Sequence, residues 1–463
     1  MTFSDYIDYL HGKRIGVIGF GVSNQPLVRV LLRSGCDVTV CDRRERAQLS
    51  TAGDEAAAQG AKFALGADYL EHLDFDVIFR TPGVLPIVPQ LRKAAQNGAI
   101  LTSEMEAFCN LCPCRILAIT GSDGKTTTST ITAELLRAQG HTVHLGGNIG
   151  TPLFDRIPDI RPEDFAVLEL SSFQLHSMHC APDVAIITNI SPNHLDVHPD
   201  FEDYVSAKCS IYRGQRPDGV LVLNAKDAHT PRFAAEAPGH VRYFSSIGPV
   251  KNGVYCADDV IYRAHDGVAE KILNADEIRI PGAHNVENYM AALLAVDGLV
   301  RDETVRRVAR EFAGVEHRIE FVRELHGVRY YNDSIATSPT RTIAGLRAFP
   351  HKVVLIAGGY DKHIPFAPLA PEVVEHVKTL ILCGATADAI ERAVVESEAY
   401  ETAAERPRIL RCKDLREAVD AAYFCAESGD VVTLSPACAA FDCYANFMER
   451  GRAYKEMVKK LGE

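Results

Sequence analysis

Short apolar runs alternate with helix-like segments along the first part of this chain. Three such runs, rich in β-branched side chains and with little alternation of apolar and polar positions, are residues 13–19, 37–42 and 76–80. Runs of this kind are typical of parallel strands that are buried on both faces of a sheet. Between the first two runs, the segment 24–34 predicts a helix that Ser23 caps and Gly35 ends.

The same alternation continues in two further blocks. The second block has predicted strands at 115–120, 165–170 and 184–189. The third has predicted strands at 328–332, 352–358, 379–383 and 430–434, separated by helical segments such as 340–348 and 415–426. A chain of 463 residues is too long to fold around a single hydrophobic core, since domains usually have about 100–200 residues. We therefore predict an α/β protein with three domains, each built on a mostly parallel sheet, at residues 1–112, 113–315 and 316–463.

The most informative motif lies between the run 115–120 and the helix-like segment 125–139. It reads Thr-Gly-Ser-Asp-Gly-Lys-Thr-Thr-Thr over residues 120–128. Glycines at both ends of a tight turn let backbone N–H groups converge on an anion, and the helix N-terminus adds positive partial charge. Although Ile119 stands where the full motif has its first glycine, the pattern predicts a P-loop that binds nucleotide phosphates. Its residues are Gly121, Ser122, Asp123, Gly124, Lys125 for the outer phosphates, Thr126 for a magnesium ion, and Thr127.

Polar side chains also follow the other two strands of the second block. Glu169 lies at the end of one strand, and His194 and Asp196 come soon after the other. Because ligands of an open parallel sheet bind beyond the carboxyl ends of its strands, we expect these side chains near the P-loop. Glu169 is predicted to bind Mg²⁺, directly or through water, because hard cations prefer oxygen ligands. A surface glutamate is the alternative there, and around His194 and His198 we favour a second Mg²⁺ over zinc.

The turn after the first predicted strand resembles a dinucleotide-binding fingerprint that lacks its third glycine. It reads Gly-Phe-Gly-Val-Ser-Asn over residues 19–24, and Asp42 stands close to where a ribose-binding acid would fall. An NAD site is therefore weakly supported. A different nucleotide moiety, such as uridine, suits the broken fingerprint better.

Charge and composition narrow the class of protein. The net charge of −12 argues against a nucleic acid or an anionic membrane as partner, because either would favour a basic face. Neither a signal peptide nor a membrane-length apolar run is apparent, so we expect a cytoplasmic protein with reduced cysteines. For the close group Cys109, Cys112 and Cys114, packing is favoured over zinc, because no second matching pair follows.

Motifs in all three blocks, in order along nearly the whole chain, resemble those of the Mur ligases. They are the P-loop and residues 146–150, 168–175, 193–196, 207–212, 284–288, 316–320, 332–334 and 434–439. The segments Gly-Gly-Asn-Ile-Gly (146–150) and Leu-Ser-Pro-Ala-Cys-Ala (434–439) point to the member that adds D-glutamate. The resemblance implies Rossmann-like first and third domains around a P-loop ATP-binding central domain.

The resemblance also implies a reaction, the ATP-dependent ligation of D-glutamate to UDP-N-acetylmuramoyl-L-alanine in cytoplasmic peptidoglycan precursor synthesis. The nucleotide-sugar carboxylate attacks the γ-phosphate, and the amine then displaces phosphate from the acyl phosphate. By the family pattern, Thr126 and Glu169 hold one Mg²⁺, while His194 and a carbamylated Lys208 hold a second. Lys125, His194 and Lys208 are then the catalytic residues, although the sequence pattern alone gives Lys208 no role.

Further site residues follow from the same resemblance. Asn288, Arg318 and Asp333 match positions for the ATP base, phosphate and ribose. The uridine diphosphate is assigned to Val22, Ser23, Asp42, Arg43, Thr81, Pro82 and Gly83, the sugar–peptide arm to Asn148, and D-glutamate to Thr337, Lys362 and Phe447. Ile335 stands where a lysine is common, and Ala440 where a serine often contacts the amino-acid carboxylate. We therefore predict that Lys362 and Thr337 carry more of the recognition in this chain.

Three other classes of protein compete with this interpretation. A ligase like folylpolyglutamate synthase shares the P-loop and the chemistry but does not need the first block. An ATP-driven switch leaves Glu169, His194 and the motifs of the third block unexplained. A dehydrogenase is disfavoured because this chain lacks the third glycine of the dinucleotide-binding fingerprint. We expect a monomer, although the sequence carries no direct signal of oligomeric state.

Overall fold

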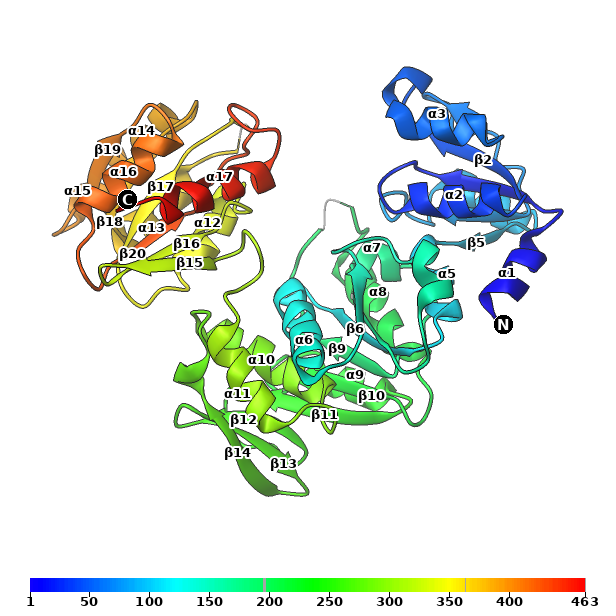
Figure 1. Cartoon of the computed structure of the whole chain (residues 1–463), viewed down its shortest axis with the longest axis horizontal. Coiled ribbons are helices and arrows are strands. Elements are labelled where there is room, and N and C mark those ends of the chain that lie inside the picture. The colour runs from blue at the N-terminus through cyan, green and yellow to red at the C-terminus, as the bar shows by residue number, and fades with distance from the viewer. Residues whose placement is uncertain (195–196, 363, 463) are drawn as a thin grey trace. The chain divides into compact units, whose positions relative to one another are not determined.

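Three β-sheets organise the chain (Figure 1). The computed structural model describes residues 1–194, 197–362 and 364–462. Contacts divide the chain into two compact units, one of residues 1–275 and 287–308, the other of residues 276–286 and 309–463. The first unit holds two sheets and the second unit holds the third. The α/β class with three mostly parallel sheets is confirmed, whereas the domain boundaries near 112 and 315 stay a prediction.

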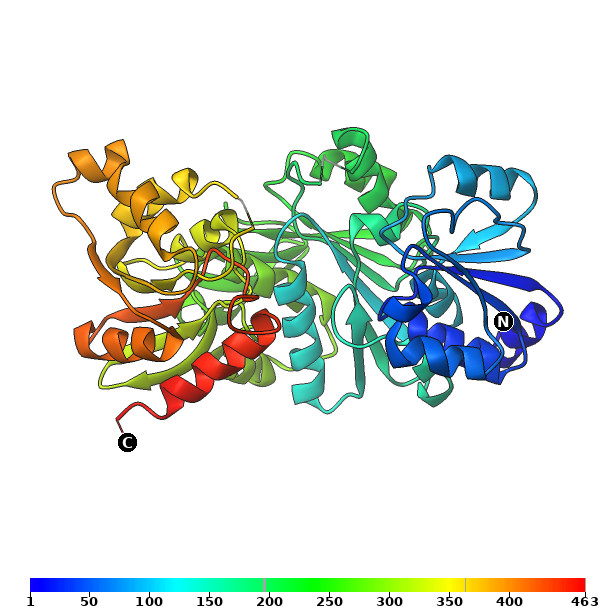
Figure 2. The same ribbon diagram turned by 90° about the horizontal axis from the view of Figure 1, so that it is seen from above.

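The first sheet is entirely parallel, with strand order β3-β2-β1-β4-β5. Its elements are α1 (Phe3–Leu10), β1 (Arg14–Ile18), α2 (Asn24–Arg33), β2 (Asp37–Asp42), the 3₁₀ helix η1 (Arg46–Gln48), α3 (Ser50–Ala58), β3 (Lys62–Leu65), β4 (Val77–Arg80), α4 (Pro89–Gln96), β5 (Ile100–Thr102) and α5 (Glu104–Leu111). Neighbouring residues of β1 pack on opposite faces, Val17 in one core cluster with Leu27 of α2 and Ile18 in another with Leu91 of α4. Figure 2 shows helices on both sides of this sheet, as the apolar runs predict.

The turn between β1 and α2 is held by a buried carboxylate rather than by a helix cap. The Ser23 side chain makes no capping hydrogen bond, so the prediction that it caps α2 is wrong. Instead, the backbone N–H of Phe20 donates to Oδ2 of Asp42 at 2.6 Å, and the Arg44 guanidinium donates to both oxygens of that carboxylate. Although burial opposes it, these hydrogen bonds lower the pKa of Asp42 to about 2.

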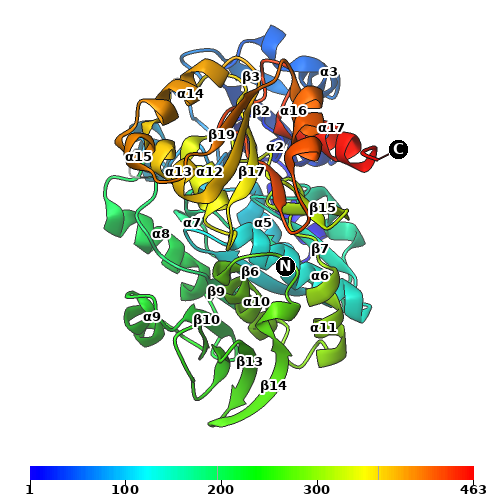
Figure 3. The same ribbon diagram turned by 90° about the vertical axis from the view of Figure 1, so that its left-hand side faces the viewer.

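The second sheet has nine strands in the order β14-β13-β12-β11-β10-β9-β6-β8-β7. The elements of this block are β6 (Arg115–Thr120), α6 (Lys125–Gln139), β7 (Val143–Gly147), η2 (Phe154–Asp159), β8 (Phe165–Glu169), α7 (Ser172–Leu175), β9 (Val184–Ile187), α8 (Phe201–Arg213), β10 (Val220–Asn224), α9 (Thr230–Glu236), β11 (His240–Ser245), β12 (Gly253–Ala257), β13 (Val260–His265), β14 (Val268–Asn274), η3 (Ala275–Glu277), α10 (Ala283–Ala295) and α11 (Asp302–Glu311). The strands from β6 to β12 pair in parallel, whereas β13 pairs antiparallel with both β12 and β14. Figure 3 shows β13 and β14 projecting at one end of this block.

The third sheet lies in the second unit, with strand order β15-β16-β20-β17-β18-β19. Its elements are β15 (Glu320–Leu325), β16 (Val328–Asn332), α12 (Pro339–Leu346), β17 (Val353–Ala357), η4 (Ala367–Leu369), α13 (Ala370–His376), β18 (Val377–Leu382), α14 (Ala387–Val395), α15 (Glu398–Thr402), β19 (Arg408–Arg411), α16 (Leu415–Cys425), β20 (Val431–Leu434) and α17 (Phe447–Lys459). Only the edge pair β15–β16 is antiparallel. Among the helices within the described ranges, none is both long and apolar enough to cross a membrane.

We expect Asp42→Asn to lower the free energy of unfolding by about 2 kcal/mol at pH 7, since one pKa unit corresponds to about 1.4 kcal/mol. The folded-state pKa of Asp42 is lowered, so its contribution is complete above about pH 4 and is lost as the pH falls toward 2. Urea unfolding at pH 7 and at about pH 2, the folded-state pKa, measures this difference. The control is Asp37→Asn at the other end of β2, where the ion pair with Lys62 is exposed and contributes less than about 1 kcal/mol. Equal losses for the two variants would contradict the assigned role of Asp42.

Candidate nucleotide and metal site

The carboxyl ends of three neighbouring strands of the second sheet form the candidate site. Strand β6 lies between β8 and β9, with Ile119 opposite Glu169 and Thr120 opposite Ile187. The P-loop, Glu169 and the segment after β9 therefore leave the sheet at one edge. This is the convergence that the sequence predicts, and it follows from the parallel order of the strands.

The P-loop has the backbone that its glycines make possible. Gly121 has a φ of 145° and Gly124 a φ of 78°, and α6 begins at Lys125 directly after Gly124. A Cβ atom on Gly121 would overlap the Thr188 hydroxyl, and one on Gly124 would overlap the Asn288 amide. Both positions therefore combine a left-handed backbone with a lack of space, and each requires glycine.

Side chains from the end of β9 and from α8 hold the P-loop in place. Thr188 donates from its hydroxyl to the Asp123 carbonyl at 2.6 Å, and Asn189 exchanges two hydrogen bonds with the backbone of Asp123. The Ser122 hydroxyl bonds to that of Tyr204 at 2.8 Å. Thr188, Asn189 and Tyr204 were not predicted from the sequence, because ordinary polar residues give no signal before the fold brings them together.

Lys125 folds back over the loop that precedes it. Its ammonium donates to the carbonyls of Gly121 and Ser122, both at 3.0 Å. The backbone N–H groups at the start of α6 carry the positive partial charge of a helix N-terminus. Thr126, in the first turn of α6, is half-buried. These groups give the loop the donors and the charge that a phosphate needs.

Glu169 is buried with one of its two carboxylate oxygens incompletely satisfied. The side chain is 1% exposed, and Oε1 accepts a hydrogen bond from Asn148 at 2.8 Å. No group in the described part of the chain donates to Oε2. A buried, unpaired carboxylate oxygen is costly unless a cation completes its environment. The residues therefore fit Mg²⁺, which Glu169 and the Thr126 hydroxyl would hold beside a nucleotide phosphate. Asn148, predicted to hold the sugar–peptide arm, orients this carboxylate.

Lys208 on α8 reaches the same edge from the other side. Lys208 is 2% exposed, and its amine donates to the Gly121 carbonyl at 2.7 Å and lies 4.7 Å from the centre of the Tyr204 ring. Burial, and to a lesser degree the positive charge of Lys125, lower the pKa of Lys208 well below its usual value. The fold therefore favours a neutral amine at this position, although the sequence pattern alone gives Lys208 no role.

His194, the remaining predicted metal ligand, is exposed. It has a left-handed φ of 55°, and its ring contacts Phe173 edge-on with a centroid distance of 5.0 Å. Asp196, predicted to act beside it, lies outside the described residues. His198, considered with His194 for a metal site, is buried, and its Nδ1 lies 2.6 Å from Oδ2 of Asp203.

Asn288, predicted to contact the ATP base, lies against the P-loop helix. The Thr128 hydroxyl donates to its side-chain oxygen at 3.2 Å, and Asn288 is 6% exposed. This contact joins α10 to α6 within the first unit.

In the second unit, several of the predicted ATP and D-glutamate residues lie at the carboxyl ends of β16 and β20. Asp333 is buried, accepts a hydrogen bond from the Ser435 hydroxyl at 2.8 Å, and has its pKa raised to about 7 by burial. Lys362 donates to the Thr337 hydroxyl at 3.2 Å, so two of the three predicted D-glutamate contacts lie together.

The other predicted residues of this unit make separate contacts. The Phe447 carbonyl accepts a hydrogen bond from Ser334. Arg318 carries a positive charge that offsets part of the rise in the pKa of Asp333 caused by burial. Ala440 is buried, and the Ile335 backbone bonds to His317. Sequence reasoning overlooked Arg450, which is 4% exposed and donates to the carbonyls of Ser334, Cys438 and Ala439.

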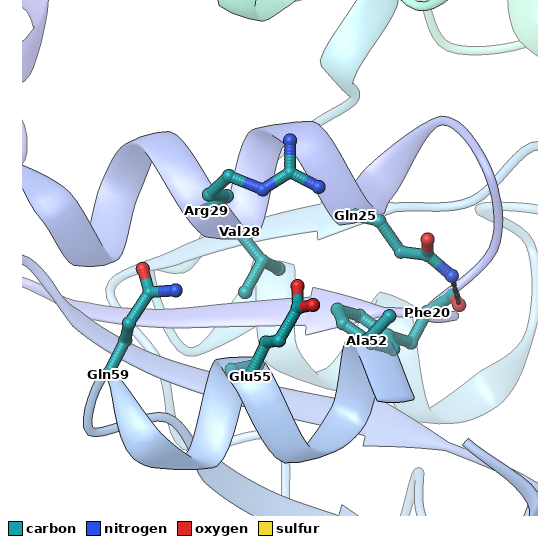
Figure 4. A pocket seen from close by; sticks show the side chains of 8 residues that line it. Phe20, Gln25, Val28, Arg29, Ala52, Glu55 and Gln59 are labelled. Atoms are coloured by element: carbon teal, nitrogen blue, oxygen red, sulfur yellow. Dashed lines mark hydrogen bonds between the residues drawn. The ribbon is translucent and has the colours of Figure 1, made fainter. Parts of the chain in front are cut away.

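The predicted uridine diphosphate residues lie at the carboxyl ends of β1, β2 and β4, which are neighbours in the first sheet. Val22, Ser23 and Arg43 are exposed. Thr81 packs against the Gly19 turn, followed by Pro82 and Gly83. The Asp42 carboxylate already accepts hydrogen bonds from the Phe20 N–H and the Arg44 guanidinium, and its role toward the uridine diphosphate stays a prediction. A small pocket between α2 and α3, shown in Figure 4, contains none of these predicted residues.

Arg80 at the end of β4 is a further residue without a signal in the sequence. It is 1% exposed, and its guanidinium donates to the Ser177 hydroxyl at 2.8 Å and to the Phe173 carbonyl at 3.0 Å. Burial lowers its pKa to about 10. Arg80 thereby links the first sheet to the segment that follows Glu169.

Comparison with known proteins assigns the chain to a family. Residues 119–296 match the Mur ligase middle domain, and residues 317–438 match the Mur ligase glutamate ligase domain. A relative from Acetivibrio thermocellus named UDP-N-acetylmuramoylalanine–D-glutamate ligase is 48% identical over 99% of this chain and 98% of its own. A relative of the same name from Clostridium beijerinckii is 48% identical over 99% of both chains. The chain belongs to the Mur ligase family, and it is an ATP-dependent amide ligase.

Solved structures support the fold. A UDP-N-acetylmuramate–alanine ligase from Thermotoga maritima superposes with a TM-score of 0.55, at 16% identity, over 96% of this chain and 99% of that one. MurF from Acinetobacter baumannii gives a TM-score of 0.52 at 18% identity, over 80% and 87% of the chains. At these identities the likeness concerns the fold alone.

We expect Glu169→Gln to separate metal binding from stability. Glutamine can still accept from Asn148 but removes the buried charge, so the protein without metal or nucleotide should melt at the same temperature or higher. The Mg²⁺ concentration for half-maximal ATP binding should rise at least tenfold, which calorimetric titration measures. Glu134→Gln on α6, where the carboxylate is 43% exposed, should change neither quantity. A large loss of stability in Glu169→Gln would instead make Glu169 a structural acceptor.

Proposed function

We propose that this chain ligates D-glutamate to UDP-N-acetylmuramoyl-L-alanine, with ATP hydrolysed to ADP and phosphate, in peptidoglycan precursor synthesis. The observation that carries the proposal is identity of 48% over 99% of the chain to relatives with that named activity. The arrangement of the P-loop, Glu169 and Lys208 at one sheet edge supports it, because the reaction requires phosphate and metal binding together.

The residues at this edge suit the phosphoryl transfer step. Lys125 and the N–H groups at the start of α6 would neutralise the charge that spreads over the γ-phosphate oxygens. Bound Mg²⁺ would supply further charge neutralisation, held at one site by Thr126 and Glu169 and at a second by His194 and Lys208. The remaining P-loop residues, Gly121 to Thr127, would cradle the phosphates. The nucleotide-sugar carboxylate would then form the acyl phosphate, which the amine of D-glutamate attacks.

Substrate residues complete the proposal. Asn288, Arg318 and Asp333 would contact ATP, and the turn residues Val22 and Ser23, with Arg43 and the segment 81–83, would bind the uridine diphosphate. Thr337 and Lys362 would bind the D-glutamate carboxylates, near Phe447. Asp42 would act indirectly, by holding the turn that carries Val22. We further propose that the enzyme acts as a monomer in the cytoplasm.

Lys208 would serve the second Mg²⁺ as a carbamate. Its low pKa favours a neutral amine, whose nitrogen can attack carbon dioxide, forming an N–C bond and releasing one proton. The product offers oxygen ligands, which Mg²⁺ prefers to an ammonium group.

We expect enzyme equilibrated with ¹³C-bicarbonate to show one carbamate carbonyl signal by NMR. Lys208→Arg should remove that signal and lower kcat at least a hundredfold, because arginine stays charged and cannot form a carbamate. The control is Lys226→Arg, at a lysine that forms an ion pair with Glu287. A signal that survives in Lys208→Arg would show that the carbamate lies elsewhere.

Phosphate release is the test of the proposed function. With ATP, Mg²⁺ and UDP-N-acetylmuramoyl-L-alanine, we expect release with D-glutamate but not with L-glutamate, L-lysine or no amine. In the same assay Lys362→Ala should raise the KM for D-glutamate at least tenfold and leave the KM for ATP within twofold, while Lys352→Ala changes neither. Phosphate release with another amine would show a ligase with a different amine substrate. Release without any amine would favour an ATP-driven switch. An unchanged KM for D-glutamate in Lys362→Ala would refute the role of Lys362.

A further inference from the structure

Two histidines and an aspartate meet beside the candidate site, at a position without a role in the proposed reaction. His176 follows the last residue of α7, His198 precedes α8, and Asp203 lies in the first turn of α8. Asp203 is 3.1 Å from Nε2 of His176 and 2.6 Å from Nδ1 of His198. One ligand atom of each residue lies within 4.8 Å of the other two.

The two histidine side chains are largely buried, and the aspartate is partly exposed to solvent. The His198 side chain is fully buried, that of His176 is 11% exposed, and that of Asp203 is 28% exposed. Burial opposes ionisation of Asp203, but the hydrogen bond from His198 and the charge of His176 lower its pKa. The group therefore offers a charged carboxylate at its entrance and two imidazoles behind it.

We propose that His176, His198 and Asp203 bind a divalent transition-metal ion of the Zn²⁺ type. Zinc takes nitrogen ligands at about 2.0–2.1 Å and carboxylate oxygens at about 2.0–2.2 Å, which needs only small shifts from the observed spacing. Three protein ligands leave a fourth position for water, on the exposed side of Asp203. Imidazole is a common ligand of zinc, whereas Mg²⁺ prefers oxygen ligands.

The surroundings of His198 suit a metal ligand. Its Nε2 lies 3.0 Å from the Ser172 hydroxyl. That oxygen would accept a hydrogen bond from Nε2–H, which keeps the proton on Nε2 and leaves Nδ1 free to coordinate a metal. Phe173 stacks on one side of the ring at 5.4 Å, and Tyr204 contacts it edge-on at 5.3 Å. The orientation of the His198 imidazole is thus fixed by packing and by a hydrogen bond to its second nitrogen.

A metal here would cross-link the segments that carry the candidate catalytic residues. It would tie α7, which follows Glu169, to α8, which carries Lys208, and to the segment after His194. Tyr204, which packs on His198, also holds the P-loop through Ser122. The ion would therefore stabilise the walls of the site without contacting the reacting groups.

Zn²⁺ titration in the presence of excess Mg²⁺ tests the proposal, because Mg²⁺ occupies the oxygen-rich sites near Glu169. We expect one Zn²⁺ per chain and a higher melting temperature in its presence. His176→Gln and Asp203→Asn should each weaken the affinity at least tenfold. The matched control is His144→Gln. His144 is half-buried, its Nε2 lies 2.9 Å from Asp164, and among the described residues no third ligand joins this pair.

Free thiols are the main competing ligands, and Co²⁺ spectra distinguish them. Cys112 and Cys114, whose sulfurs lie 3.4 Å apart, are the pair to exclude, and Cys112→Ser removes one of them. At the proposed site Co²⁺ should give visible d–d bands without a thiolate charge-transfer band. The bands should persist in Cys112→Ser and disappear in His176→Gln.

Three results would overturn the proposal. They are Zn²⁺ affinity that is equal in His176→Gln and the parent protein, a Co²⁺ spectrum dominated by thiolate, and no binding at micromolar Zn²⁺. Circular dichroism of each variant without metal establishes that it is folded. If Asp203→Asn does not fold, His176→Gln alone decides, because His176 is not part of a helix. If any of the three results is found, His176, His198 and Asp203 form a hydrogen-bonded group and not a metal site.

Discussion

The position of β6 between β8 and β9 is the constraint on which the candidate site depends. Parallel strands that are neighbours deliver their carboxyl ends to one edge, so the P-loop, Glu169 and Thr188 meet without long connections. The close approach of Thr188 to Gly121 leaves no room for a side chain there. Lys208 then bonds to the carbonyl of the same glycine. One backbone position thus organises contacts from β6, β9 and α8.

Much of this arrangement was predictable from the sequence, because apolar runs and glycine turns are local signals. β2, β6, α6 and β16 begin and end at the predicted residues. The hairpins of β12 to β14 were not predicted. Asp258 and Asp259 form the turn between β12 and β13 with φ values of 49° and 55°, without the glycine that usually marks such turns. The turn between β13 and β14 does have the usual Asp-Gly pair, at residues 266 and 267, so a local signal was present there. Contacts such as those of Arg80 and Asn189 depend on segments far apart in sequence, and no local pattern reveals them.

Stability and activity make opposite demands on the second sheet. Glu169 and Lys208 are both almost completely buried, and no group in the described part of the chain donates a hydrogen bond to Oε2 of Glu169. Such groups cost free energy of folding. A site that must gather a metal ion and phosphates gains from ligands that are already dehydrated and oriented. The extensive apolar core shared by the first two sheets offsets this cost.

Strand β14, an outer strand of the second sheet, is free of these demands. Five strands separate β14 from β6, and the first four residues of β14 are exposed. A two-residue turn, Asp266 and Gly267, joins β13 to β14. Insertions are tolerated best at exposed turns of this kind. This turn is therefore a natural attachment point for a fluorescent reporter or for new chain termini, at the greatest strand distance from the phosphate-binding edge.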